Sequence, residues 1–93
     1  MGDERMNRLK DVREDFDFTQ KEIAEKLHIQ QTHYSRYELG KQMMGIDKYM
    51  ILSLFYNISI DYLCGMVDTP RTLTGISYNE NLQIRKKKQN SNK

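Results

Sequence analysis

The sequence is poor in cysteine, contains no tryptophan and has no long apolar run. Its single cysteine, Cys64, cannot form an internal disulfide, which agrees with a reducing compartment. No stretch approaches the roughly 20 consecutive apolar residues that a membrane-spanning helix requires, and the N-terminal residues include no apolar signal region. These absences predict a cytoplasmic protein without a membrane segment.

The patterns that carry catalysis or bind metals are also missing. With 38% hydrophobic residues, the 93-residue chain can close one modest core, which leaves little room for a deep catalytic cavity. No glycine-rich phosphate loop occurs, and no Ser–His or Cys–His pair with an orienting acid is visible. His28 and His33 fall on different sides of a predicted turn, and no cysteine or carboxylate set completes a metal site around them. We therefore expect no enzyme, no cofactor and no metal.

Charge is unevenly distributed along the chain. Residues 1–68 contain nine lysines and arginines against twelve acidic residues, a net charge of −3, whereas residues 69–93 contain six against one, a net charge of +5. The part of the chain that is expected to fold therefore has no general electrostatic attraction for nucleic acid. Any contact with DNA has to come from a local patch, helped by the basic C-terminal residues.

The spacing of apolar residues predicts an all-α domain. Met6, Leu9, Val12 and Phe16 recur at intervals of three and four, which is typical of an amphipathic helix. Similar spacing continues through the first two thirds of the chain. The five expected helices cover about residues 4–15, 20–27, 30 or 31 to 39, 46–56 and 60–64.

Local signals indicate where several of these helices begin and end. Thr19 with Glu22 three residues later fits a capping box, so the second helix is expected to begin at Gln20. Gly40 is expected to stop the third helix and Asn57 the fourth. The second and third helices are then joined by a turn of only about two residues, as in a helix-turn-helix.

Residues 1–68 are predicted to form one domain, and residues 69–93 a mostly disordered basic tail. Beyond Pro70 sizeable apolar residues become few, and the chain ends in the run Arg85–Lys88 followed by polar residues. Such a segment buries too little apolar surface to fold by itself. Local docking of residues 73–84 on the domain is the alternative.

The predicted third helix has one edge of polar side chains with base-reading chemistry. At about 100° per residue, these side chains fall within one arc of about 140°; they are Gln31, Thr32, Ser35 and Arg36. Glutamine can pair with adenine, arginine with guanine, and the threonine methyl can meet the methyl group of thymine. Tyr34 and Tyr37 fall on the opposite side, where they can enter a core. The edge fits reading of a DNA major groove; an ordinary solvated helix face is the alternative.

Around this edge the sequence resembles the lambda-repressor-like, Cro-type helix-turn-helix family of phage and bacterial regulators. The resemblance extends over roughly residues 6–68 and rests on four stretches: Leu9–Glu14, Thr19–Leu27 with its Ala24, Ser35–Lys41 and Ile58–Gly65. It implies a compact five-helix, all-α, DNA-binding domain. In such a domain the third helix lies in the major groove of double-stranded DNA.

The resemblance also implies roles for individual residues. Base reading falls to Gln31, Thr32 and Arg36, with Ser35 beside them. Positions that contact phosphates, or lie at the margin of the reading surface, are Gln20, Gln30, His33 and Lys41. Arg13 and Glu38 match a partly buried ion pair that ties the first helix to the third, and their role is structural.

Three places depart from the family pattern. His28 stands where the family usually has glycine, at a turn position that tends to need a positive φ, so some strain is expected. Tyr34 replaces a commoner, smaller β-branched residue at a buried site, so the local packing must differ. Met43–Gly45 replaces a loop that often contains proline and a basic residue, which removes one expected phosphate contact.

Ile51 and Leu54, in the fourth helix, fall where family members usually expose polar residues. They form either extra core, covered by the tail, or a contact between two subunits. Dimers that bind half-sites one helical turn apart are a common way for short reading helices to hold DNA.

The sequence as a whole is interpreted as a bacterial or phage-encoded transcriptional repressor that binds double-stranded DNA as a homodimer, with a regulatory protein as a further candidate partner. The alternative is an antitoxin-like, protein-binding module with the same fold. The acidic charge of residues 1–68 and the two apolar residues of the fourth helix motivate that alternative.

Overall fold

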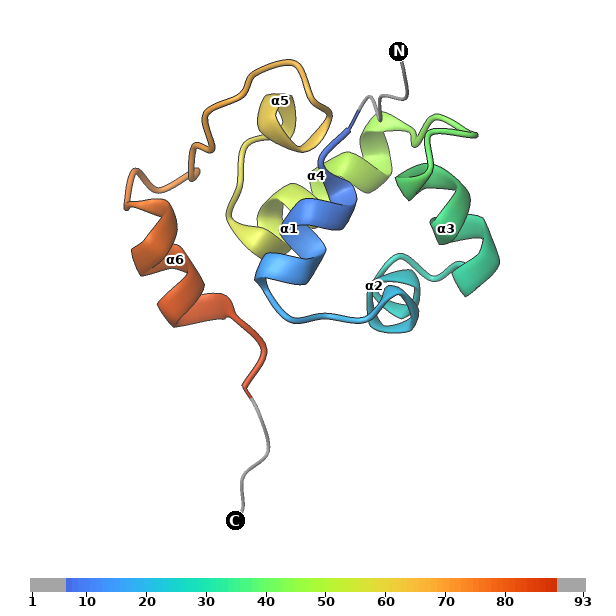
Figure 1. The fold of residues 1–93 in the computed structure, drawn as a ribbon, viewed down its shortest axis with the longest axis horizontal. Helices are drawn as coiled ribbons and strands as arrows, with labels where there is room; N and C mark the ends of the chain where they lie inside the picture. Colours follow the sequence, from blue (N-terminus) through green and yellow to red (C-terminus); the bar gives the residue numbers. More distant parts are fainter. Residues whose placement is uncertain (1–6, 89–93) are drawn as a thin grey trace.

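The computed structural model describes residues 7–88, and this part of the chain is helical without a β-sheet (Figure 1). Its helices are α1 (Leu9–Asp15), α2 (Gln20–Lys26), α3 (Gln31–Glu38), α4 (Ile46–Tyr56), α5 (Ile60–Leu63) and α6 (Tyr78–Arg85). An isolated antiparallel bridge joins Ile58 to Thr72. The predicted all-α class is confirmed, and α6 adds a sixth helix to the five expected from the sequence.

Helix α1 begins later than the apolar spacing predicts. The side-chain oxygen of Asn7 accepts a hydrogen bond from the N–H of Leu9 at 3.0 Å, and residues 7 and 8 precede the helix. The first residues of the expected helix, 4–6, lie outside the described range. From Leu9 onward the expected apolar face is present, because Leu9, Val12 and Phe16 are all fully buried.

Helix α2 begins at the capping box that the sequence predicts. The hydroxyl oxygen of Thr19 accepts a hydrogen bond from the N–H of Glu22 at 3.1 Å, and the Glu22 carboxylate accepts one from the N–H of Thr19 at 2.8 Å. After α2 the chain turns sharply through His28, whose φ of 60° is the positive value expected at this position. The N–H of Ile29 then bonds to the carbonyl of Ala24 at 3.0 Å, which closes the turn and directs α3 across α2.

The core lies among α1 to α5, and aromatic rings fill much of it. Phe16 and Tyr56 pack with their ring centroids 5.0 Å apart. Tyr34 is fully buried, and its burial raises the pKa of the phenol far above the ordinary value. The other buried apolar residues of this cluster are Leu9, Val12, Ile23, Ala24, Leu27, Tyr37, Met44, Leu52, Ile58 and Leu63. Two departures from the family pattern, Tyr34 and Met44, therefore supply core.

The expectation of a mostly disordered tail over residues 69–93 is corrected by the structure for the part up to residue 88. Asn81 of α6 is completely buried, and its side-chain N–H donates to the carbonyl of Tyr56 at 2.8 Å. The side-chain oxygen of Asn81 accepts a hydrogen bond from Asn57 at 3.1 Å. Tyr78 packs edge-on against Phe16, with the ring centroids 6.1 Å apart. Buried polar hydrogen bonds and aromatic contacts hold this segment, so its low apolar content does not indicate disorder.

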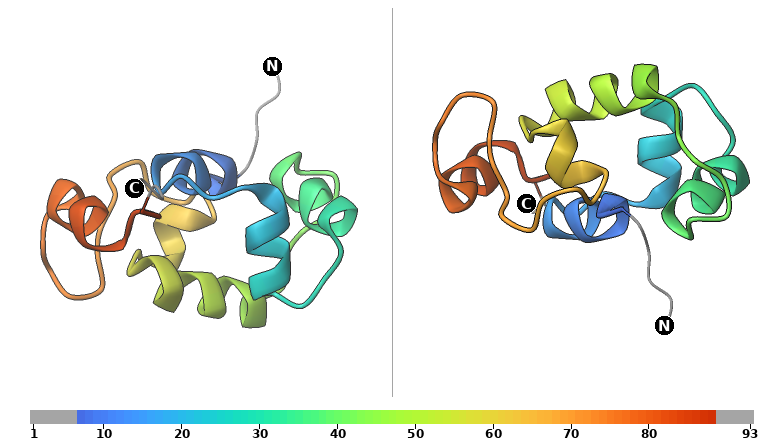
Figure 2. Two further views of the ribbon diagram at one scale, coloured as in Figure 1. Left: turned by 90° about the horizontal axis from the view of Figure 1, so that it is seen from below. Right: turned by 90° about the horizontal axis from the view of Figure 1, so that it is seen from above.

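The last residues of the predicted tail, 89–93, lie outside the described range. None of the helices in residues 7–88 has the length and the apolar character of a membrane span. Figure 2 shows α2 and α3 side by side at one end of the molecule, with α6 at the other end.

Candidate nucleic-acid interface

Helix α3 is held against the domain by one face and exposes the other. Tyr34, Tyr37 and Glu38 are buried on the inner face. On the outer face Gln31, Thr32 and Arg36 are exposed, and Ser35 is half-buried beside them. The small Ala24 is only 1% exposed and belongs to α2, the helix that packs against α3. The three main candidates for base reading therefore project from α3 into solvent.

His33, one of the marginal candidates, has a partner inside the domain. Its Nε2 lies 3.1 Å from the hydroxyl of Tyr37, one helical turn further on, and the two rings have centroids 5.0 Å apart. His33 is half-buried as a result. The carbonyl of Tyr37 accepts a hydrogen bond from the side chain of Asn7 at 2.8 Å. These contacts make His33 a support of α3, whereas Gln30, at the N-cap of α3, is exposed.

The structure brings Arg13 of α1 and Glu38 of α3 together in a two-pronged ion pair. The Nε of Arg13 donates to Oε2 of Glu38 at 2.6 Å, and Nη2 donates to Oε1 at 3.1 Å. The Nη1 of Arg13 donates to the carbonyl of Phe18 at 2.9 Å. The side chains are 10% and 2% exposed, so water screens this pair far less than a surface pair. It links the first helix, the loop before α2 and the end of α3.

The electrostatics of Glu38 follow from these contacts. Burial alone disfavours its carboxylate, but the hydrogen bonds from Arg13 and Gln20 help to outweigh that effect, so the pKa of Glu38 lies below its ordinary value. Its hydrogen bond to Arg13 correspondingly raises the pKa of the guanidinium. Both groups are therefore charged at neutral pH.

Gln20, expected from the family resemblance to touch a phosphate, has another partner in the structure. Its side-chain N–H donates to Oε1 of Glu38 at 3.0 Å, and the residue is half-buried. Gln20 thus completes the hydrogen bonding of the ion pair between Arg13 and Glu38. Sequence reasoning places Gln20 at the start of α2 but gives no sign of this partner, which is 18 residues further along the chain.

The loop after α3 presents Lys41 to solvent. Gly40, with a φ of 75°, ends the helix, and the N–H of Lys41 bonds to the carbonyl of Arg36 at 3.0 Å. Lys41 is exposed, as are the neighbouring Leu39 and Met43. The position therefore leaves the Lys41 ammonium accessible at one end of the polar edge of α3. We refer to this edge, formed by Gln31, Thr32, Ser35 and Arg36, as the reading edge.

Helix α4 has exposed apolar residues as well as buried ones. Ile51 is 40% exposed and Leu54 70%, so the C-terminal segment does not cover them within the described range. Ile46 and Met50 are also exposed on this helix and extend the same surface. We refer to these four residues as the α4 strip.

The sequence indicates that basic C-terminal residues can help DNA binding, but it does not show that a group of them lies beside α2. These residues follow α6 and are the lysines of the C-terminal run, which contact the junction of α1 and α2. A local signal for α6 was present, because Ser77 and Glu80 form a second capping box, with the Glu80 N–H donating to the Ser77 hydroxyl at 3.0 Å.

Two helices joined by a tight turn, with the second helix exposing a polar edge, define a helix-turn-helix domain. The family model described as helix-turn-helix matches residues 9–63. The chain belongs to this family, as the resemblance to the lambda-repressor-like, Cro-type regulators implied. The family is one of helix-turn-helix domains and not of enzymes.

Two curated proteins of Bacillus subtilis (strain 168) are similar to the chain. The HTH-type transcriptional regulator ImmR is 45% identical over 58 residues, which is 62% of this chain and 46% of ImmR. YobD, an uncharacterized HTH-type transcriptional regulator, is 35% identical over 63 residues, which is 68% of this chain and 56% of YobD. The chain thus spans about half the length of these relatives. No solved structure matches it significantly.

Proposed function

We propose that the protein is a sequence-specific regulator of transcription that binds double-stranded DNA through α3. The observation that carries this proposal is the exposure of Gln31, Thr32 and Arg36 on the outer face of α3, while Tyr34 and Tyr37 are buried behind them. An α-helix that is exposed along one polar edge fits the major groove, which is about 12 Å wide. The names of the two relatives support the same function.

The reading edge has the chemistry to distinguish base pairs. Arg36 can donate two hydrogen bonds to guanine, and Gln31 can exchange two with adenine. Thr32 offers a methyl group to thymine, and Ser35 can bond to several bases. Each well-made pair of hydrogen bonds contributes about 1–3 kcal/mol of discrimination against the wrong base. Lys41 and Gln30 lie at the two ends of the edge, where phosphates flank the groove.

We propose further that the protein acts as a homodimer, with the α4 strip as the contact between subunits. Four exposed apolar side chains on one short helix are costly in water, and a second copy of the helix can cover them. A two-fold dimer presents two reading helices, which fit half-sites about 34–36 Å apart on a palindromic operator. Occupancy of such an operator near a promoter blocks polymerase, so repression in the cytoplasm of a bacterium, or of a phage's host, is the proposed outcome.

A second candidate function is an antitoxin-like module that sequesters another protein. Two observations favour it: residues 1–68 have a net charge of −3, and the α4 strip is uncovered. In that case a partner protein, and not a second copy of the chain, covers the strip.

Selection from random duplexes separates the two candidates. The purified protein is mixed with a pool of random double-stranded DNA, and the retained molecules are sequenced. Enrichment of one palindrome is the expected result. If no sequence is enriched while a co-purified protein binds tightly to wild type but not to Leu54→Lys, the DNA-binding proposal is wrong and the module is supported.

A further inference from the structure

Three carboxylates form an acidic edge at the junction of α1 and α2. They are Asp15, the last residue of α1, Asp17 in the following loop and Glu22 in the first turn of α2. Unpaired carboxylates at this place would repel a phosphate backbone that approaches α2. At about 0.15 M salt such a repulsion acts over roughly 8 Å, so only neighbouring charges can cancel it.

The C-terminal segment contacts every member of this acidic edge. The hydroxyl of Tyr78 donates to Oδ2 of Asp15 at 2.8 Å. The Nζ of Lys86 lies 3.5 Å from Oδ2 of Asp17. Lys87 forms an ion pair with Glu22, and the hydrogen bond from Lys87 holds the pKa of that carboxyl below its ordinary value.

The backbone of the segment is fixed to the domain at the same place. The N–H of Lys87 donates to the carbonyl of Phe16 at 2.9 Å. Phe16 lies between Asp15 and Asp17 in the sequence. The N–H of Lys86 bonds to the carbonyl of Leu82 at 2.8 Å and ends α6. Lys86 and Lys87 therefore begin from a fixed main chain and not from a loose tail, and Lys88 directly follows them in the sequence.

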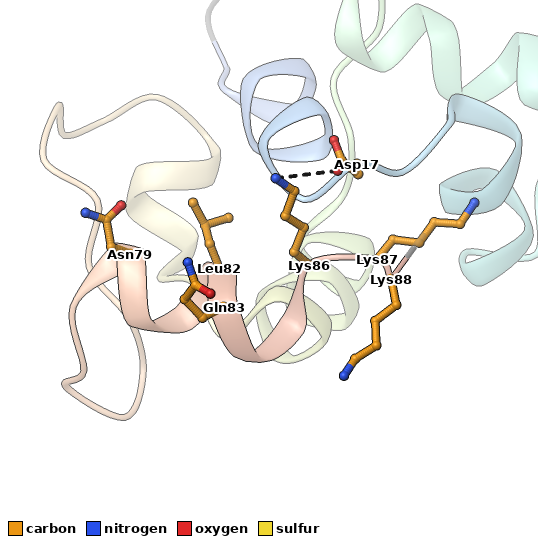
Figure 3. A pocket seen from close by; sticks show the side chains of 7 residues that line it. All are labelled: Asp17, Asn79, Leu82, Gln83, Lys86, Lys87 and Lys88. Carbon is orange, nitrogen blue, oxygen red and sulfur yellow. Dashed lines mark ion pairs between the residues drawn. The ribbon is translucent and has the colours of Figure 1, made fainter. Parts of the chain in front are cut away.

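Figure 3 shows how these side chains are distributed around an open hollow of about 520 Å³. Lys86 points toward Asp17, Lys87 extends toward α2, and Lys88 points away from the domain. The hollow is lined by Asp17, Asn79, Leu82, Gln83, Lys86, Lys87 and Lys88. We refer to the three lysines as the basic run. Lys88 makes no ion pair within residues 7–88 and is exposed.

We propose that the basic run is a phosphate-binding part of the DNA interface, which contacts the backbone of the same duplex that α3 reads. This inference rests on the proposed function. Lys86 and Lys87 cancel the charges of Asp17 and Glu22, and Lys88 supplies a positive charge directed to solvent. The first turn of α2 connects the basic run to α3, because Glu22 pairs with Lys87 and belongs to the helix that packs against α3.

The distribution of charge explains why a domain of this kind needs the additional contact. Residues 1–68 have a net charge of −3, so α3 has to approach a polyanion from a negatively charged domain. Residues 69–93 have a net charge of +5, and α6 fixes part of this charge at the edge next to α2. A lysine that contacts a phosphate acts as a point charge, and such a contact carries no base information. The basic run is therefore expected to raise affinity for every sequence by the same factor.

The salt dependence of DNA binding tests the proposal with one matched pair of variants. Lys88→Gln removes one positive charge from the basic run, and Arg71→Gln removes one from the same C-terminal segment, ahead of α6. Affinity is measured by fluorescence anisotropy from 50 to 200 mM salt, on the selected operator and on a scrambled duplex. The slope of log K against log salt is negative, and we expect Lys88→Gln to reduce its magnitude by about 0.9 on both duplexes, the effect of one lost phosphate contact. We expect Arg71→Gln to leave the slope unchanged.

The triple variant Lys86→Gln, Lys87→Gln, Lys88→Gln extends the test, with thermal unfolding as the check that the domain is still folded. Its slope should fall further than that of Lys88→Gln, while the preference for operator over scrambled DNA stays the same. A wild-type slope in the triple variant overturns the proposal. An equal effect of Arg71→Gln also overturns it, because the charges then act at a distance and not by contact. Loss of sequence preference in the triple variant has the same consequence.

Failure of the proposed function gives a different result. In that case the selection enriches no operator, and the wild-type protein does not distinguish one duplex from another. The comparison of Lys88→Gln with Arg71→Gln can still be made on unselected DNA, so the two failures are distinguishable.

Discussion

The side chain of Asn81 in α6 donates a hydrogen bond to the main-chain carbonyl of Tyr56 at the end of α4, at 2.8 Å and out of contact with water. This bond and its neighbours fix a segment whose composition resembles that of a disordered tail. The carbonyl of Tyr56 belongs to the last turn of a helix, where it has no partner within the helix. Asn81 therefore satisfies a group that would otherwise be buried without a hydrogen bond.

Replacement of Asn81 by leucine is expected to destabilise the protein by about 1–3 kcal/mol, the cost of leaving a buried polar group without its partner. Asn57 also loses an acceptor, because its side chain donates to Asn81. Denaturation in urea measures the change in the free energy of unfolding. The matched control is Asn79→Leu, an exposed position of the same helix, which should change stability by less than about 0.5 kcal/mol. Equal effects of the two variants would contradict the role given to Asn81.

The ion pair between Arg13 and Glu38 is expected to contribute to stability in a pH-dependent way. The pKa of Glu38 is lower in the folded protein than in the unfolded chain. Its contribution is therefore fully present above the unfolded pKa of about 4.3 and is lost as the pH falls through the lower folded value. Glu38→Gln should cost about 3–5 kcal/mol at pH 7, since it leaves the Arg13 guanidinium buried without its partner.

The pH dependence of unfolding, measured from pH 7 to pH 2, checks this expectation. The wild-type protein should lose stability over the acid range, and Glu38→Gln should show a flatter curve. Glu22→Gln serves as the control, because the ion pair of Glu22 with Lys87 is exposed and glutamine keeps the capping box. Its cost should stay below about 1 kcal/mol. Parallel acid curves for wild type and Glu38→Gln would show that the buried pair is not the source.

The left-handed turn between α2 and α3 predicts a stabilising substitution. His28 has a φ of 60°, a conformation that costs a residue with a Cβ atom roughly 1–2 kcal/mol. Glycine avoids this cost but has more freedom in the unfolded chain, which offsets part of the gain. His28→Gly should therefore raise the free energy of unfolding by about 0.5–1 kcal/mol. Glu25→Gly, inside α2, should instead lower it by about 1 kcal/mol. A loss of stability in His28→Gly would mean that the imidazole makes a contact of greater value than the strain.

These positions show how far the sequence alone leads. The capping box at Thr19 depends on a few neighbouring residues, so a local pattern predicts it correctly. The left-handed conformation of His28 was expected from the family resemblance, because the family usually has glycine at this position. The ordered C-terminal segment depends on Asn81 meeting α4, 25 residues earlier, which no local pattern contains. The partner of Gln20 was missed for the same reason, since a helical wheel gives the direction of a side chain but not what lies there.

The reading edge of α3 predicts two kinds of DNA-binding variant. Arg36→Ala should weaken binding to the selected operator by about 1–3 kcal/mol and relax the preference at one base pair, because arginine reads a base edge. Lys41→Ala should weaken binding to all sequences alike, because we expect this lysine to contact a phosphate. It should also reduce the magnitude of the slope of log K against log salt by about one. Competition binding against a set of single-base operator variants distinguishes them. If Arg36→Ala weakens every duplex equally, Arg36 contacts the backbone and base reading falls to its neighbours.

The α4 strip predicts a change of oligomeric state on introducing charge. Leu54 is 70% exposed and Ile51 is 40% exposed, so a lysine at either position can reach water in a monomer and should leave the fold intact. In a dimer with this strip at its centre, each lysine faces apolar side chains of the second subunit and, near the two-fold axis, its own copy. Burying unpaired lysine ammonium groups in the dimer costs far more free energy than exposing the lysine side chains to water in separate subunits, so dissociation is the favoured outcome. Sedimentation equilibrium of Ile51→Lys and Leu54→Lys should therefore give monomer masses.

Met66→Lys serves as the control, because Met66 is 80% exposed outside the strip and its variant should keep the wild-type mass. Wild-type mass in both strip variants would exclude the strip as the subunit contact, and the two reading helices would then have to be paired through another surface or by the DNA itself.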